Sequence, residues 1–180
     1  ASYRDKTVYP IFGDAGSATA VELDKTAAPI HYNLQTDGSG YEAIIIPHGG
    51  KRHPITKDSI TYKKHGKGII RRDDQAILDG MAIFKFAVNE VPAQVKALAA
   101  KCDLTLEEVD YFVFHQANKI INETIRKILR VPPEKMPYSL KEYGNTVGAS
   151  IPVTLVAQIR EQAQAQKLKL LLSGFGVGLS

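Results

Sequence analysis

The sequence contains a single cysteine, Cys102, and no tryptophan in 180 residues. One cysteine excludes an intrachain disulfide framework, and the first residues lack the basic and apolar stretches of a secretory leader. The longest apolar run, at residues 168–172, is far shorter than the roughly 20 residues that a membrane-spanning helix needs. These absences predict a soluble, cytoplasmic protein with no membrane partner.

The sequence also lacks the patterns of two common binding sites. The formal charge is +4, but the basic residues are scattered and carry no interleaved aromatic motif, which argues against a nucleic-acid partner. The histidines show no metal-ligand spacing, so we expect no metal site. Outside the motif discussed below, they are His31, His48, His53 and His65.

Hydrophobic patterning predicts a single α/β domain with a mixed sheet covered by helices on both faces. Three-to-four spacing of apolar residues predicts helices over residues 84–98, after Asn118 and after Ser150. Short apolar or alternating segments between turn residues predict strands. The predicted strands are residues 7–12, 18–23, 30–34, 43–46, 111–114 and 168–173.

Three predicted corners, at residues 114–118, 143–146 and 174–178, carry polar or glycine-rich sequence. Functional groups in layered α/β folds gather at the carboxyl ends of strands, so these corners are the expected rim of an active site. Taken alone, His115 can equally be bonded to a backbone carbonyl, and Asn145 can simply complete a turn. These alternatives stay open at the level of single residues.

Glycine-rich turns at residues 13–16 and 174–178 lack the spacing of phosphate-binding and dinucleotide-binding motifs. Cys102, the only thiol, follows a predicted helix, and the negative end of the helix dipole opposes thiolate formation there. We therefore expect Cys102 to be structural or incidental rather than a nucleophile.

Several motifs together resemble a known family. Residues 114–118, Phe-His-Gln-Ala-Asn, precede an isoleucine-rich helix and are similar to the His-Gln-Ala-Asn signature of type III β-ketoacyl-[acyl carrier protein] synthases. Residues 12–16 resemble the family's Phe-Gly-Asp-Gly-Ala-Gly turn, and residues 79–88 its Gly-x-x-Val-Phe-Lys-x-Ala-Val segment. The motifs Tyr-Gly-Asn-Thr, Ser-Ile-Pro and Gly-Phe-Gly then follow in the family's order, at residues 143–146, 150–152 and 174–176.

This resemblance implies a thiolase-like layered fold whose C-terminal half, with a mixed five-stranded sheet, is residues 1–180. It also implies that the family's nucleophilic cysteine lies in an N-terminal half not contained in this sequence, and that the family's last strand follows Ser180. The isolated chain is then expected to be inactive.

The resemblance further implies an acyltransferase that condenses an acyl-CoA with malonyl-acyl carrier protein in fatty acid biosynthesis. His115 and Asn145 match the family's catalytic histidine and asparagine, and Asn118 would support that corner as a helix cap. The oxyanion and active-site wall would be formed by Phe175, Gly176 and Val177.

Partners and cofactors follow from the same resemblance. The substrates would be carried on coenzyme A and on the carrier protein's phosphopantetheine, with no resident cofactor, and the enzyme would be a homodimer. An acidic carrier protein would dock on basic residues, although Ile120 occupies the position of the family's usual arginine. Two alternatives remain: a related condensing enzyme of secondary metabolism, or a non-catalytic carrier-binding or dimerisation module. The predicted docking residues are Lys85, Lys119, Arg126 and Lys127.

Overall fold

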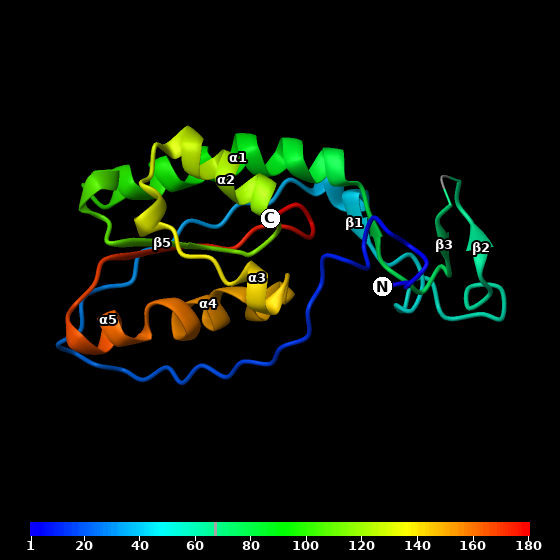
Figure 1. Ribbon diagram of the computed structural model, residues 1–180, viewed down its shortest axis with the longest axis horizontal. Helices are drawn as coiled ribbons and strands as arrows, with labels where there is room; N and C mark the ends of the chain where they lie inside the picture. The colour runs from blue at the N-terminus through cyan, green and yellow to red at the C-terminus, as the bar shows by residue number, and fades with distance from the viewer. Residues whose placement is uncertain (67) are drawn as a thin grey trace. The chain divides into compact units, whose positions relative to one another are not determined.

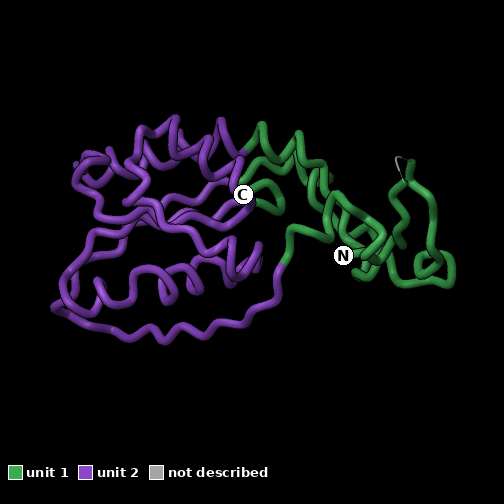
Figure 2. Tube along the Cα trace, in the orientation of Figure 1, with its two compact units in different colours: residues 1–12, 36–86, 176–180 green, residues 13–35, 87–175 purple. Residues whose placement is uncertain are grey.

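The computed structural model describes residues 1–66 and 68–180, which form two compact units (Figure 2). The first unit combines Ala1–Phe12, Thr36–Phe86 and Gly176–Ser180. The second combines Gly13–Gln35 and Ala87–Phe175, and it contains the corners at residues 114–118 and 143–146. Most of the predicted site therefore belongs to one unit.

The first unit is built from short antiparallel strand pairs. Strand β1 (Ile44–Ile45) pairs with β4 (Ile77–Leu78), and β2 (Lys63–Lys64) pairs with β3 (Ile70–Arg71). A 3-10 helix, η1 (Gly38–Ala43), leads directly into β1. The predicted strand at residues 43–46 is thus confirmed in its two central residues.

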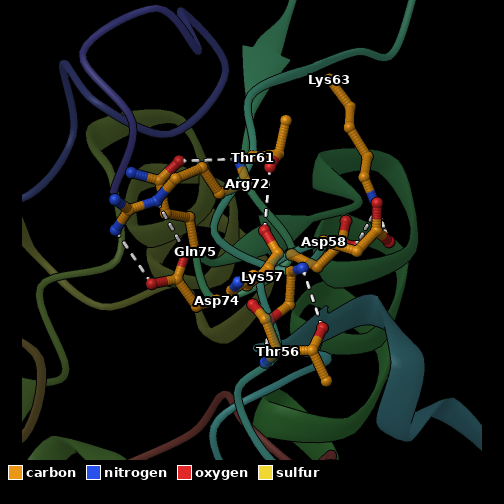
Figure 3. A network of polar contacts seen from close by, with 10 residues as sticks. Thr56, Lys57, Asp58, Thr61, Lys63, Arg72, Asp74 and Gln75 are labelled. Atoms are coloured by element: carbon orange, nitrogen blue, oxygen red, sulfur yellow. Dashed lines mark hydrogen bonds and ion pairs between the residues drawn. The ribbon is translucent and has the colours of Figure 1, made fainter.

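Side-chain ion pairs stiffen the loop that carries β2 and β3 (Figure 3). Lys63 Nζ lies 2.7 Å from an Asp58 carboxylate oxygen and 2.6 Å from one of Asp73. Arg72 bonds Asp74 with both arms of its guanidinium, each at 2.9 Å. Because bidentate pairs fix both distance and orientation, they hold this polar loop in a defined shape.

In the second unit a parallel strand pair lies between two layers of helices (Figure 1). Strand β5 (Tyr111–Phe114) pairs with β6 (Leu170–Ser173), with Tyr111 opposite Leu170 and Phe114 opposite Ser173. One layer contains α2 and the later turns of α1, and the other contains α4 and α5. The helices are α1 (Gly80–Lys101), η2 (Leu106–Glu108), α2 (Lys119–Leu129), η3 (Pro133–Lys135), α3 (Leu140–Tyr143), η4 (Val147–Ala149), α4 (Ser150–Gln158) and α5 (Arg160–Ala165).

The core of the second unit follows from sequence periodicity. Residues four apart on α1 and on α2 share one helix face, and those faces are buried. Burying one large apolar side chain stabilises the fold by about 1.5–3 kcal/mol, so these stripes position both helices. The buried residues are Ala87, Val91, Val95 and Ala99 on α1, Ile121, Ile125 and Leu129 on α2, and Phe112, Val113 and Phe114 on β5.

The α/β class is confirmed, but the expected five-stranded sheet is not formed. The described strands make three two-stranded sheets. Residues 7–11 form turns and Phe12 makes an isolated bridge, while residues 18–23 and 30–34 run without a strand partner, and Leu23 is 90% exposed. Period-two alternation predicts which side chains share a face, whereas a strand forms only where a second backbone lies beside it.

Across the described residues, none of the helices has both the length and the apolar character required to span a bilayer.

Candidate active site

The first corner of the site follows β5. His115 extends the strand pairing, because its backbone N–H donates to Ser173 O at 2.8 Å. Three residues later, Asn118 Oδ1 accepts the Ile121 N–H at 2.9 Å and caps α2. An asparagine cap fixes where the helix begins. The backbone at His115 is therefore held by the strand pairing before it and by the capped helix after it.

Two buried amides hold this corner from inside. The Gln116 side chain is fully buried; its Nε2 donates to Phe114 O at 2.8 Å, and its Oε1 accepts the Ser139 N–H at 3.0 Å. Asn122 Nδ2 donates to His115 O at 3.0 Å. Sequence reasoning did not assign roles to these residues, although Gln116 lies inside the motif that identified His115.

The second corner carries Asn145 in a strained loop. Gly144 before it has φ 66° and ψ −162°, a backbone conformation essentially restricted to glycine. Val147 after it has φ 53°, which is rare for a β-branched residue. Asn145 Oδ1 accepts the Val147 N–H at 2.9 Å, and this bond helps the loop to hold its conformation.

Residues 13–16 are irregular rather than the predicted turn, and Gly13 contacts the same loop. Gly13 N–H donates to Asn145 O at 3.0 Å. A Cβ atom at this position would overlap the carbonyl oxygen of Tyr143, so the close approach requires glycine. Gly13 therefore supports the Asn145 loop.

The loop of Asn145 contacts the corner of His115 directly. Asn145 Nδ2 donates to Ala117 O at 3.3 Å, and Ser150 Oγ lies 2.7 Å from His115 Nδ1. The ring of Phe175 meets the imidazole edge to face, with centroids 5.5 Å apart and planes at 86°. The structure thus brings together His115, Asn145 and Phe175 from three separate corners.

Burial sets the protonation state of the site. Desolvation lowers the pKa of His115 from its ordinary value of 6.5, and backbone hydrogen bonding with Val147 opposes this shift only in part. His115 is therefore neutral at pH 7. A neutral imidazole N–H and an asparagine amide can both donate hydrogen bonds to an oxygen on which negative charge develops.

Two predicted wall residues belong to the first unit. Gly176 has φ 152° and its N–H donates to Ser180 O at 2.8 Å, while Val177 is 65% exposed. The backbone of Val177 as an oxyanion donor stays a prediction.

The predicted docking residues differ in their surroundings. Lys119 and Lys127 are exposed on α2, and Lys85 is exposed on the part of α1 that belongs to the first unit. Arg126 is instead bonded to Glu123 and, at 2.8 Å, to Val131 O. Its charge is neutralised within its own helix, so among the described residues α2 presents two exposed cations without an ion pair, Lys119 and Lys127, rather than three.

Cys102 directly follows α1, as the sequence predicts, and is partly buried. Within residues 1–66 and 68–180, no three histidine, cysteine or acidic side chains are grouped in a way that could hold a metal ion.

Comparison with known proteins gives a consistent result. Residues 99–180 match the family model described as 3-oxoacyl-[acyl-carrier-protein (ACP)] synthase III C terminal. The chain is 36% identical to the β-ketoacyl-[acyl-carrier-protein] synthase III of Rhodopirellula baltica, over 98% of this chain and 54% of that protein. It is 32% identical to the synthase of the same name from Lactococcus lactis, over 99% and 52% respectively.

Solved structures show the same correspondence. A crystal structure of a 3-oxoacyl-(acyl-carrier-protein) synthase III matches 99% of this chain and 53% of its own, with a TM-score of 0.84 and 31% identity. The synthase III from Thermus thermophilus matches 99% of this chain and 52% of its own, with a TM-score of 0.75 and 25% identity. The chain thus spans about half the length of the relatives it matches.

Proposed function

We propose that this chain, which is similar over nearly its whole length to about half of 3-oxoacyl-[acyl-carrier-protein] synthase III proteins, is the C-terminal half of a member of that family and the half that activates the malonyl substrate. The whole enzyme would join an acyl group from acyl-CoA to malonyl-acyl carrier protein in fatty acid biosynthesis. The observation that carries the proposal is the contact between the His115 corner and the Asn145 loop, sealed by the 3.3 Å bond from Asn145 to Ala117 O.

The reaction also needs a nucleophile, and we assign it to the part of the relatives that this chain does not match. There a cysteine thiolate attacks the acyl-CoA thioester and releases coenzyme A, leaving an acyl-enzyme. Malonyl thioester then loses carbon dioxide, and the electron pair of the broken C–C bond forms an enolate. The enolate carbon attacks the acyl-enzyme carbonyl, and the cysteine thiolate leaves as the β-ketoacyl thioester forms.

His115 and Asn145 act at the decarboxylation step. Negative charge moves from the malonyl carboxylate onto the thioester oxygen, and both side chains donate hydrogen bonds to that oxygen. One preorganised donor of this kind contributes about 2.7–4 kcal/mol to transition-state stabilisation. Because His115 is neutral, the donation requires no proton transfer to the substrate.

The Asn145→Ala variant tests this role in the native polypeptide that carries the chain. We expect decarboxylation of malonyl-acyl carrier protein, followed as released carbon dioxide, to fall about 10²–10³-fold. Asn33→Ala is a matched control, since Asn33 is exposed and bonds only Gln94 in the described chain. Decarboxylation at the wild-type rate in Asn145→Ala would refute the assignment.

We extend the proposal to partners and setting. Acyl-CoA and malonyl-acyl carrier protein would be the substrates, without a resident cofactor, and the enzyme would be a cytoplasmic homodimer. The names of the relatives and the exposed Lys119 and Lys127 support an acidic carrier partner. The same lysines favour the alternative that the isolated chain binds a carrier protein without catalysing condensation. A related condensing enzyme of secondary metabolism would use the same two donors.

A further inference from the structure

We propose that Ser150 is a positioning residue that fixes the tautomer of His115, so that the imidazole proton is held on Nε2. Ser150 is the first residue of α4, and its side chain is 1% exposed. Its hydroxyl oxygen lies 2.7 Å from His115 Nδ1, a short distance that indicates a good hydrogen bond. The kinetic part of this inference rests on the proposed function, whereas the tautomer itself does not.

The surroundings of the hydroxyl decide which atom donates. The backbone N–H of Gln116 also points at Ser150 Oγ, at 3.4 Å, and a backbone N–H can only donate. The oxygen of Ser150 is therefore used as an acceptor by Gln116. In the described chain the hydroxyl proton has one hydrogen-bonding acceptor, His115 Nδ1.

This arrangement distinguishes the two neutral forms of the imidazole. If Nδ1 carries no proton, the Ser150 O–H donates a hydrogen bond to it, and the hydroxyl oxygen accepts one from the Gln116 N–H. If Nδ1 carries the proton, two N–H donors face one oxygen, and the buried hydroxyl proton loses its acceptor. The Nε2–H form is favoured for that reason.

The consequence concerns the reacting oxygen. A neutral histidine has one N–H, so holding it on Nε2 leaves that N–H available to a substrate. Ser150 would thereby make His115 a donor without touching the substrate itself.

Nitrogen-15 NMR of the native polypeptide that carries the chain tests the inference directly. The imidazole signals of His115, assigned by their loss in His115→Gln, should show a protonated Nε2 and a bare, hydrogen-bonded Nδ1. In Ser150→Ala we expect a mixture that includes the Nδ1–H form, and in Ser150→Thr a return toward the single form. A protonated Nδ1 in the wild-type protein would overturn the inference, even if no variant folds.

Thr154→Val is the matched control for a purely structural effect. Thr154 is buried one turn along α4 and its hydroxyl donates to Ser150 O at 2.8 Å, but it makes no hydrogen bond with His115. This variant should lower the melting temperature and leave the His115 tautomer unchanged. An equal change of tautomer in Ser150→Ala and Thr154→Val would contradict a specific role for Ser150.

Kinetics separate this inference from the proposed function. We expect Ser150→Ala to lower kcat for malonyl decarboxylation roughly tenfold while KM stays constant, the effect of one hydrogen bond. If the His115 tautomer changes in Ser150→Ala but kcat stays at the wild-type value, the Ser150 hydrogen bond has no role in catalysis. Failure of Asn145→Ala to lower decarboxylation would instead refute the proposed function and leave the tautomer result intact.

Discussion

Replacing Gln116 by methionine should destabilise the second unit by several kcal/mol. Methionine has a similar length and volume, so it fills the same space and leaves hydrogen bonding as the main difference. In the native protein, Gln116 Nε2 donates to Phe114 O at 2.8 Å and its Oε1 accepts the Ser139 N–H at 3.0 Å. Both bonds vanish in Gln116→Met.

The magnitude follows from what the substitution leaves behind. Gln116 is fully buried, so water cannot replace the lost partners of the Phe114 carbonyl and the Ser139 amide. A buried polar group left unsatisfied costs about 1–3 kcal/mol, and two such groups give about 2–6 kcal/mol. Since folded domains are stable by only about 5–15 kcal/mol, this loss is large.

Urea unfolding of the native polypeptide that carries the chain, monitored by circular dichroism, measures this loss. Gln158→Met is the control, because Gln158 is exposed at the end of α4 and its replacement should change stability by less than about 0.5 kcal/mol. A loss in Gln116→Met no larger than in the control would refute the reasoning. It would mean that the Phe114 and Ser139 groups find other partners.

Two further predictions concern protonation and docking. Burial lowers the pKa of His115, so between that lowered pKa and 6.5 the unfolded state binds more protons than the folded state. The contribution of His115 to the free energy of unfolding is therefore complete above pH 6.5. It is lost as the pH falls through the lowered pKa. Unfolding free energies measured against pH should therefore fall more steeply on acidification in the wild-type protein than in His115→Gln, and parallel curves would contradict this. Charge reversal in Lys119→Glu or Lys127→Glu should weaken binding of malonyl-acyl carrier protein about fivefold in a low-salt titration. The control Lys167→Glu, on an exposed segment away from α2, should leave the affinity unchanged. Equal affinities in all three variants would exclude α2 as the docking surface.

Local signals in the sequence predicted much of the second unit. The apolar segment at residues 111–114 is strand β5, and Asn118 caps the helix that follows it. The helix pattern was only partly informative, because Ile121 and Ile125 are buried whereas Ile120 is 73% exposed. Helix periodicity fixes the angle between side chains around the axis, but the width of the buried stripe depends on what packs against it.

The sequence also placed His115 and Asn145 at corners, and the family resemblance gave them a common role. It could not show that Gln116 joins the His115 corner to Ser139, or that Ser150 lies against His115 Nδ1. These contacts link residues 23 and 35 positions apart in the chain. No local pattern encodes the orientation of such side chains.

The sequence by itself determined where helix caps, glycine turns and apolar faces lie, because capping, glycine conformation and hydrophobic period act over a few neighbouring positions. Only the tertiary structure decided that the Gln116 side chain bonds the Ser139 backbone, and that residues 18–23 have no strand partner. Pairing of strands and contacts of buried side chains depend on distances between segments that are remote in the chain. Those distances are set when the whole unit packs, and no short stretch of sequence contains them.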